Sequence, residues 1–138
     1  MAPAKTTFDR ALVAVLHGDI VEFSRLTWQD EDAAYHALKA GFTLARRAIK
    51  DHGGNMVNTA GDSLLAVFST ATAAAKAAMV LQQQLALANQ SVSKIQHLRA
   101  RIGINLGEVI VDGDQAFGNG VNVAARLQEI APPGGICI

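Results

Sequence analysis

The chain has 138 residues, half of them hydrophobic and 17% charged, which is enough apolar sequence for one folded domain with a buried core. Its 12 basic and 12 acidic residues balance, which argues against a nucleic-acid-binding protein with a broad basic face. The single cysteine, Cys137, excludes an internal disulfide and fits a reducing compartment such as the cytoplasm, where we expect the protein to act.

The first predicted element is a strand at 11–16 that is buried on both faces, because apolar residues run there without interruption. This run is too short to cross a lipid bilayer, so no membrane span is expected, and residues 1–9 are predicted to be a flexible leader. A helix follows, with Asp30 or Asp32 as its N-cap and the glycines at 53–54 as its end. Apolar side chains at steps of three and four are predicted to share one face of this amphipathic helix: Tyr35, Leu38, Phe42, Ala45 and Ile49.

A β-hairpin is predicted next, with strands at 55–59 and 63–68 joined by a tight turn at 61–62. Ser69 or Thr70 can cap the alanine-rich helix that follows the hairpin. The face of this helix that packs on the sheet is expected to contain Ala74, Ala78, Leu81 and Leu85. Three glutamines fall off that face and are expected to point toward water: Gln82, Gln83 and Gln84.

Strict alternation of apolar residues predicts a strand at 98–106, with a bend at Gly107 before a further strand segment at 109–111. A loop at 112–120 that contains glycine and aspartate then leads into a helix at 121–130. Two prolines stop this helix, and the last residues read as a turn that enters one more strand.

The order of these elements indicates an α+β sandwich with a mainly antiparallel sheet and helices packed on one face. No internal repeat or interdomain linker is visible, so residues 10–138 are predicted to be one domain. Because the chain stops on the first residues of a strand, we expect this domain to be incomplete at its C-terminus.

Two acidic residues lie where predicted strands end, Asp19 after the first strand and Asp62 in the hairpin turn. If the hairpin pairs beside the first strand, both carboxylates face one point, and such oxygen ligands suit Mg²⁺ that carries a polyphosphate. The backbone N–H groups of 20–24 can meet phosphate oxygens at a helix start. The alternative for Asp62 alone is ordinary turn chemistry, whereas a carboxylate at the end of an apolar strand is costly to bury without a partner.

Asn122 and Arg126 are four residues apart on the predicted helix at 121–130 and therefore share one helix face. The several donors of an arginine suit the charge of a pentavalent phosphorus. The alternative is a solvated surface arginine, but the preceding glycine loop favours a functional interpretation. His17, close to Asp19, is interpreted as a packed or solvent-edge histidine and not as a metal ligand.

A family resemblance rests on four segments that occur in order: 18–26 (GDIVEFSRL), 58–65 (NTAGDSLL), 101–107 (RIGINLG) and 117–127 (FGNGVNVAARL). Together they closely resemble the catalytic domains of class III nucleotidyl cyclases, over nearly the whole chain. The resemblance implies a ferredoxin-like α+β sandwich. It also implies an intracellular signalling enzyme in which the 3′-hydroxyl of ATP attacks the α-phosphate in line, giving 3′,5′-cyclic AMP and pyrophosphate.

The resemblance also assigns roles to matching residues in the first half of the chain. Asp19 and Asp62 would bind two Mg²⁺ or Mn²⁺ ions, and the backbone carbonyl of Ile20 would contact one of these ions. The turn that cradles the β- and γ-phosphates would consist of Val21, Glu22, Phe23 and Ser24.

In the second half of the chain, Asn122 would orient the ribose and Arg126 would stabilise the transition state. The family works as a head-to-tail dimer, so the resemblance implies a homodimer that carries two sites. In each site one chain would supply the metal ligands, and its partner would supply Asn122, Arg126 and the residues that read the base.

Two positions depart from the pattern of adenine-specific members. Asn58 stands where they commonly carry lysine, and Gln115 where they commonly carry aspartate. Because an amide both donates and accepts, this pair can read adenine or guanine, and it is also open that neither residue touches the base. We favour ATP over GTP, as the commoner substrate of the family. A phosphate-contacting lysine of the family usually lies beyond Ile138, so the expected truncation also predicts weak binding or inactivity.

The competing hypothesis is a non-catalytic cyclase-like module that dimerises or binds nucleotide and regulates a partner. The complete set of Asp19, Asp62, Asn122 and Arg126 favours the enzyme, since a silent module need not keep all four. A helical repeat scaffold is excluded by the alternating strand at 98–106 and by the hairpin.

Overall fold

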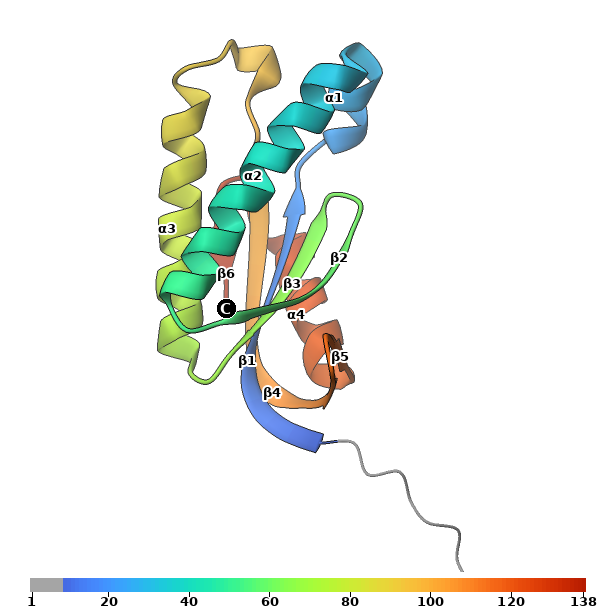
Figure 1. The fold of residues 1–138 in the computed structure, drawn as a ribbon, viewed down its shortest axis with the longest axis vertical. Helices are drawn as coiled ribbons and strands as arrows, with labels where there is room; N and C mark the ends of the chain where they lie inside the picture. The colour runs from blue at the N-terminus through green and yellow to red at the C-terminus, as the bar shows by residue number, and fades with distance from the viewer. Residues whose placement is uncertain (1–8) are drawn as a thin grey trace, which may run out of the picture.

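The computed structural model describes residues 9–138, with the side chains of residues 58–60 outside the described part. Its strands are β1 (Asp9–Ile20), β2 (Asn55–Ala60), β3 (Ser63–Phe68), β4 (Ala100–Asp112), β5 (Gln115–Phe117) and β6 (Ile136–Cys137). The strand order is β2-β3-β1-β4-β5, with antiparallel pairing throughout, and β6 adds to β4 in parallel (Figure 1). The predicted α+β sandwich with a mainly antiparallel sheet is therefore confirmed.

The helices are α1 (Phe23–Gln29), α2 (Glu31–Asp51), α3 (Ala71–Asn89), the short 3₁₀ helix η1 (Lys94–Gln96) and α4 (Asn119–Ile130). Both predicted caps of the long helices form, because Asp30 accepts a hydrogen bond from the amide of Ala33 and Thr70 accepts one from the amide of Ala73. The short elements α1, η1 and β5 have no strong periodic pattern, and β5 lies inside the predicted loop at 112–120.

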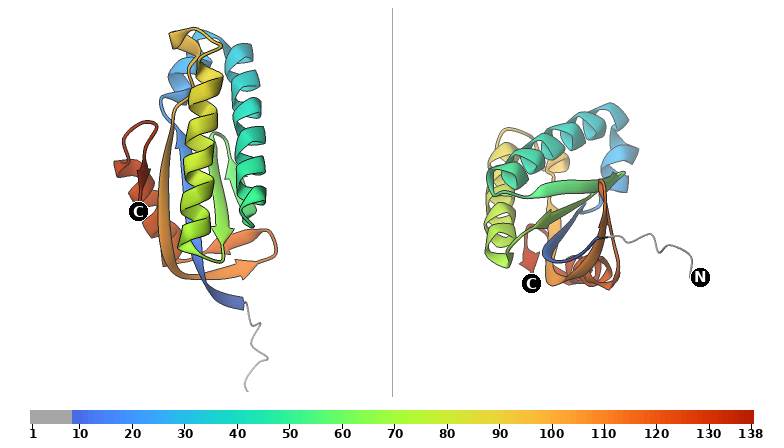
Figure 2. Two further views of the ribbon diagram at one scale, coloured as in Figure 1. Left: turned by 90° about the vertical axis from the view of Figure 1, so that its left-hand side faces the viewer. Right: turned by 60° about the horizontal axis from the view of Figure 1, so that its bottom comes forward.

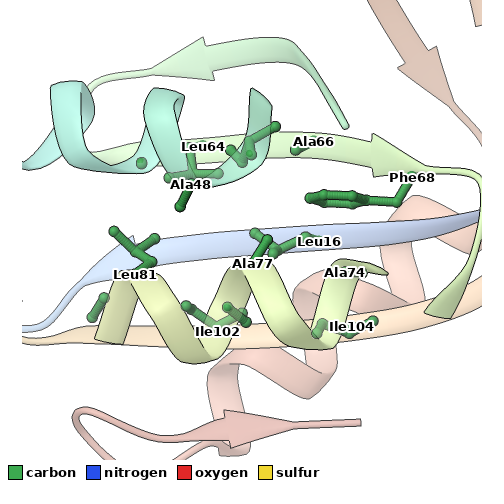
Figure 3. Close-up of a cluster of buried hydrophobic side chains, with 14 of the residues drawn as sticks. Leu16, Ala48, Leu64, Ala66, Phe68, Ala74, Ala77, Leu81, Ile102 and Ile104 are labelled. Carbon is green, nitrogen blue, oxygen red and sulfur yellow. The ribbon is translucent and has the colours of Figure 1, made fainter. Parts of the chain in front are cut away.

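The main core lies between the sheet and the two long helices α2 and α3 (Figure 3). Phe68, Leu16, Ile102 and Ile104 are at most 2% exposed, and small alanines of α3 allow the helix to approach the sheet closely. The predicted inner face of α3 is confirmed, since all four of its members are buried: Ala74, Ala78, Leu81 and Leu85.

The prediction that the helices cover only one face of the sheet is wrong for α4. This helix packs on the opposite face, where Ala124 contacts Val15, Leu65 and Val109 (Figure 2). Successive strand side chains point to opposite faces, so the neighbours Val15 and Leu16, exposed by 0% and 1%, require cover on both sides. The uninterrupted apolar run of β1 already carried this signal.

The central strands β1 and β4 pair over the whole length of β1, from Asp9 opposite Val111 to Ile20 opposite Ala100. The predicted bend at Gly107 does not interrupt this pairing. The strand β1 begins one residue inside the predicted leader and extends past Asp19, which places the carboxylate within the sheet. Asp19 lies near the end of this ladder where Ile20 pairs with Ala100, and Asp9 and Val111 form its other end.

Two expectations about helix faces are wrong. Tyr35 is 55% exposed because the first turns of α2 pack through Ala34 against Leu26 of α1. Gln82 does not point into water: its amide nitrogen donates to the carbonyls of Ala100 and Gly135, at 3.0 and 2.9 Å. These two bonds join α3 to β4 and to the turn before β6.

We predict that Gln82→Ala lowers the free energy of unfolding by about 1–3 kcal/mol, because two part-buried hydrogen bonds that join α3 to other elements are lost. Denaturant unfolding followed by circular dichroism measures this loss. The matched control is Gln83→Ala, on the exposed side of the same helix, which should change stability by less than about 0.5 kcal/mol. Equal effects of the two substitutions would contradict the assigned role of Gln82.

None of the helices in the described part of the chain combines the length and the apolar character needed to cross a lipid bilayer.

Candidate active site

The two acidic residues singled out in the sequence meet at one end of the sheet. Asp19 of β1 lies opposite Ser63 of β3, and Asp62 directly precedes Ser63 in the hairpin turn. Gly61 makes this turn possible, because its φ of +58° lies in the left-handed region that glycine adopts without strain. The carboxyl groups of Asp19 and Asp62 are close enough to hydrogen-bond to each other.

This pair carries an electrostatic cost in the absence of a cation. Burial, followed by the hydrogen bond and the negative charge of Asp62, raises the pKa of Asp19 to about 6. The amide of Ile20, which donates to Asp19 Oδ1 at 2.8 Å, and the charge of Arg101 oppose this shift. Two carboxylates that repel each other at the edge of a core provide a site that a divalent cation would stabilise.

An apolar cavity of about 20 Å³, room for roughly one water molecule, lies beside the carboxylates. Asp19 and Asp62 border it, and the rest of its wall is mostly apolar, including Leu38, Phe42 and Leu81 from α2 and α3. The cavity therefore limits the access of water to one side of the carboxyl pair. This explains why burial is the largest cause of the raised pKa of Asp19.

Arg101 belongs to the same site, although the sequence analysis gave it no role. It lies opposite Asp19 in the β1–β4 ladder, and its Nε is buried with no hydrogen-bond partner in the described part of the chain. A guanidinium group with an unpaired N–H beside two carboxylates can donate to an anionic ligand of the site. Only the strand register brings Arg101 to Asp19, so the alternating pattern alone did not identify it.

The predicted phosphate-binding turn connects β1 to α1. Glu22 has φ +56° and is the only non-glycine residue with a positive φ among the described residues. The amide of Val21 already donates to the carbonyl of Arg99 at 2.8 Å. The amides of Phe23 and Ser24 lie in the first turn of α1, where a helix leaves its N–H groups without internal partners. Unlike the amide of Val21, these two amides therefore have no backbone partner in the described part of the chain.

Asn122 and Arg126 do not join the carboxylates within one chain. Both are exposed on α4, and neither side chain has a hydrogen bond or an ion pair in the described part of the protein. The start of α4 packs on Glu108, and about 23 Å of strand separates Glu108 from Arg101 at about 3.3 Å per residue. Asn122, in the first turns of α4, therefore lies toward the opposite end of the sheet from Asp19.

Four contacts fix α4 on the sheet. Gly103 and Gly120 lie where the helix and β4 touch, because a Cβ atom at either position would collide with the opposing element. The side-chain amide of Asn105 donates to the carbonyl of Gly120 at 3.1 Å. At the other end of the helix, His17 lies against Gln128, and burial lowers the pKa of this histidine. Its packed position agrees with the sequence interpretation.

The two residues predicted to read the base lie on strands that contact each other through the curl of the sheet, β2 and β5 (Figure 2). Gln115 is exposed at the start of β5, opposite Asp112. The backbone of Asn58 pairs with Leu65 in β3, and its side chain lies outside the described part of the structure. The role of both amides stays a prediction.

Residues 6–138 match the family described as the adenylate and guanylate cyclase catalytic domain. The chain belongs to this family. A relative named putative adenylate cyclase 3 from Rhizobium meliloti is 37% identical over 98% of the chain. A crystal structure named adenylate/guanylate cyclase/hydrolase from Silicibacter pomeroyi is 37% identical, has a TM-score of 0.86, and aligns over 94% of this chain and 76% of that one.

The fold of this cyclase domain is also shared with more distant proteins. The adenylyl cyclase CyaB from P. aeruginosa is 21% identical with a TM-score of 0.83, and the alignment covers 94% of this chain and 77% of that one. The chain spans only part of its curated relatives, 23% of the R. meliloti protein and 32% of an adenylate cyclase from Streptomyces coelicolor. The comparisons therefore show a cyclase domain.

Two carboxylates are the only acidic ligands that the cyclase domain gathers at this site, since no group of three or more His, Cys, Asp or Glu side chains forms among its described residues. A divalent cation here would need further oxygen ligands, such as a backbone carbonyl and the phosphates of a bound nucleotide. The residues fit an open magnesium or manganese site better than a closed structural metal site.

We predict that Asp19→Asn stabilises the metal-free chain near pH 7 by about 1 kcal/mol, after allowance for screening by solvent at this half-buried position. The pKa of Asp19 is raised in the folded state, so its favourable contribution is full below about pH 4 and is lost as pH rises through about 6. The gain should therefore vanish at pH 4. Urea unfolding between pH 4 and 7.5 in EDTA measures it.

The control for this prediction is Asp114→Asn, which removes an exposed carboxylate from the loop before β5. It should leave stability within about 0.5 kcal/mol at every pH. Mn²⁺ should then stabilise the unsubstituted chain more than Asp19→Asn, because a ligand stabilises the state that binds it. A gain for Asp19→Asn that does not depend on pH would contradict the assigned repulsion.

Proposed function

We propose that this cyclase domain converts ATP to 3′,5′-cyclic AMP and pyrophosphate and so produces an intracellular signal in the cytoplasm. The observation that carries this proposal is the meeting of Asp19 and Asp62 beside Arg101 at one end of the sheet. In the reaction, a bond forms between the 3′-oxygen and the α-phosphorus, and the bond from that phosphorus to the oxygen bridging to the β-phosphate breaks. Pyrophosphate leaves with this oxygen.

Two Mg²⁺ or Mn²⁺ ions bound at Asp19, Asp62 and the carbonyl of Ile20 would activate the attacking oxygen and stabilise the leaving one. The protein holds the terminal phosphates with the amides of Phe23 and Ser24 in the turn that begins at Val21 and Glu22. The guanidinium of Arg101, whose Nε is without a partner in the described part, offers the phosphates a charged donor on the other side.

Asn122 and Arg126 complete the site from a second copy of the chain. Asn122 lies toward the far end of the sheet from Asp19, and neither Asn122 nor Arg126 makes a hydrogen bond or an ion pair with the carboxylates in the described part of the chain, which supports this proposal. In a two-fold dimer, the exposed surface of α4 in one copy lies over the carboxylates of the other, and symmetry generates two sites. The exposed apolar side chains Val123 and Ile130 on α4 fit a face that is covered by a partner.

Arg126 then stabilises the negative charge that develops on the α-phosphate, and Asn122 orients the ribose by hydrogen bonds. Gln115 and Asn58 read the base from the same chain as Asn122 and Arg126. Because both are amides, GTP is the second candidate substrate.

The test is the formation of cyclic nucleotide from ATP or GTP with Mn²⁺ by purified protein, in the longest form that its gene encodes. We expect cyclic AMP, with pyrophosphate in equal amount. Asp62→Asn should lower the rate by a factor of roughly 100 or more, because metal binding is weakened. A clear preference for GTP would replace ATP as the proposed substrate. An absence of cyclic product from both nucleotides would overturn the proposal of an enzyme and favour a regulatory module.

A further inference from the structure

A second pocket of about 360 Å³ lies beyond the end of β1, between α1 and the segment that leads from η1 into β4. Three of the chain's 12 basic residues line it, Arg25, Lys94 and Arg99, together with His97. The only acidic side chain in its wall is that of Glu22. This concentration of positive charge is a local property, because the chain as a whole has a net charge of zero.

Hydrogen bonds hold the wall of this pocket that carries Lys94, His97 and Arg99. The side chain of Asn89 donates to the carbonyl of Leu98 at 2.8 Å and accepts from its amide at 2.9 Å. The carbonyl of Arg99 accepts from the amide of Val21, which ties this wall to the turn after β1. The cationic side chains therefore project from a fixed backbone, and less entropy is lost when they gather around a ligand.

One cation of the pocket, Arg25, already pairs with a carboxylate. Glu22 adopts a strained positive φ, and one of its carboxylate oxygens lies 3.0 Å from a guanidinium nitrogen of Arg25. This single carboxylate leaves Lys94 and Arg99 without a negative partner among the described residues. A second anion with several oxygens would balance the remaining charge, and guanidinium groups match phosphate geometry well.

We propose that this pocket binds a small multivalent phosphate-class anion, either free pyrophosphate or the terminal phosphates of a nucleotide. The pocket is separate from the carboxylate pair, yet Val21 and Glu22 border it directly after the end of β1. Arg99 lies in the connection directly before β4, and Arg101 is the second residue of that strand. Anion binding in this pocket is separate from the proposed reaction, and it requires neither a divalent cation nor turnover.

The experiment titrates inorganic pyrophosphate into the isotope-labelled chain in EDTA and follows the imidazole signals of the histidines by NMR. His97 lines the pocket, whereas His36 lies on α2 and His52 directly follows it, and both serve as internal references. We expect saturable shifts at His97 and at the amides of Val21 and Glu22, with little change at His36 and His52. Shifts of similar size at all histidines would overturn the proposal in favour of diffuse ion binding.

Matched variants decide whether the named side chains are responsible. The double variant Lys94→Ala with Arg99→Ala should weaken pyrophosphate binding by about tenfold or more, since two charged donors are lost. The control pair Lys76→Ala with Arg46→Ala removes the same charge from exposed positions on α3 and α2 and should bind as the unsubstituted chain does. Equal binding by the two double variants would overturn the proposal.

Glu22→Gln removes the opposing carboxylate and should tighten pyrophosphate binding by about threefold to tenfold. Weaker binding by this variant would contradict the arrangement of charges. The same titration with Asp62→Asn keeps the two proposals apart, because that variant should lose most of the cyclase activity and yet bind pyrophosphate normally.

Nucleotide titrations then identify the source of the anion. If ATP displaces pyrophosphate from His97 and AMP does not, the pocket takes the terminal phosphates of a nucleotide. If pyrophosphate shifts His97 and ATP does not, the pocket takes the free anion. Shifts at His17 without shifts at His97 would place the anion at Arg101 and overturn the proposal.

Discussion

Equal amounts of an Asp19→Ala chain and an Arg126→Ala chain should together recover about a quarter of the cyclase activity of the unsubstituted protein. Each variant alone should lose activity by a factor of roughly 100 or more, because it lacks either a metal ligand or the cation that stabilises the transition state. Random pairing makes about half of the dimers mixed, and each mixed dimer has one intact site. Initial rates of cyclic nucleotide formation after mixing measure the recovery.

The control mixture combines Asp19→Ala with Asp62→Ala. Both substitutions damage the carboxylate pair, so every site in a mixed dimer lacks one metal ligand and no recovery is expected. Equal recovery in the two mixtures would contradict the sharing of sites, and so would an absence of recovery in the first mixture when the dimers form. Sedimentation of the mixtures shows whether they form.

Gly103→Ala should destabilise the protein by about 3 kcal/mol and abolish most of its activity. A Cβ atom at this position would collide with the backbone of Ala124 and Gln128, so α4 must move away from the sheet. The movement also displaces Asn122 and Arg126, which α4 carries. Denaturant unfolding measures the loss of stability, and the rate of cyclic nucleotide formation measures the loss of function.

The matched substitution is Gly41→Ala on α2. A Cβ atom there would lie 3.5 Å from Leu98 Cδ1, an ordinary contact, and alanine favours a helix more than glycine does. Gly41→Ala should therefore stabilise the protein by about 0.5–1 kcal/mol or leave it unchanged. If the two variants were equally stable, the close packing of α4 at Gly103 would be refuted.

The site was predictable from the sequence where short segments determine local geometry. The apolar run that ends near Asp19 and the glycine before Asp62 placed each carboxylate at the end of a strand, and pairing of the hairpin beside β1 then brought them together. The caps at Asp30 and Thr70 are likewise local and were predicted. Such features depend on residues that are neighbours in the chain.

Features that depend on register or on the choice of a face were not predictable in this way. Arg101 meets Asp19 only because β1 and β4 align at that position. Gln82 lies off the apolar stripe of its helix and was expected in water, yet it reaches two carbonyls that belong to other elements. The unbroken apolar run of β1 predicted burial on both faces of the sheet, but no local signal assigned α4 to the second face.

The continuous pairing of β1 with β4 has a consequence for which insertions and deletions the protein tolerates. Removal of a single residue between Leu16 and Asp19 would turn the carboxylate to the opposite face of the sheet, since side chains alternate along a strand. The same deletion in the segment 90–93, between two secondary structure elements, would shorten a connection only. Natural variation in length should therefore be absent from the first strand and concentrated in that connection.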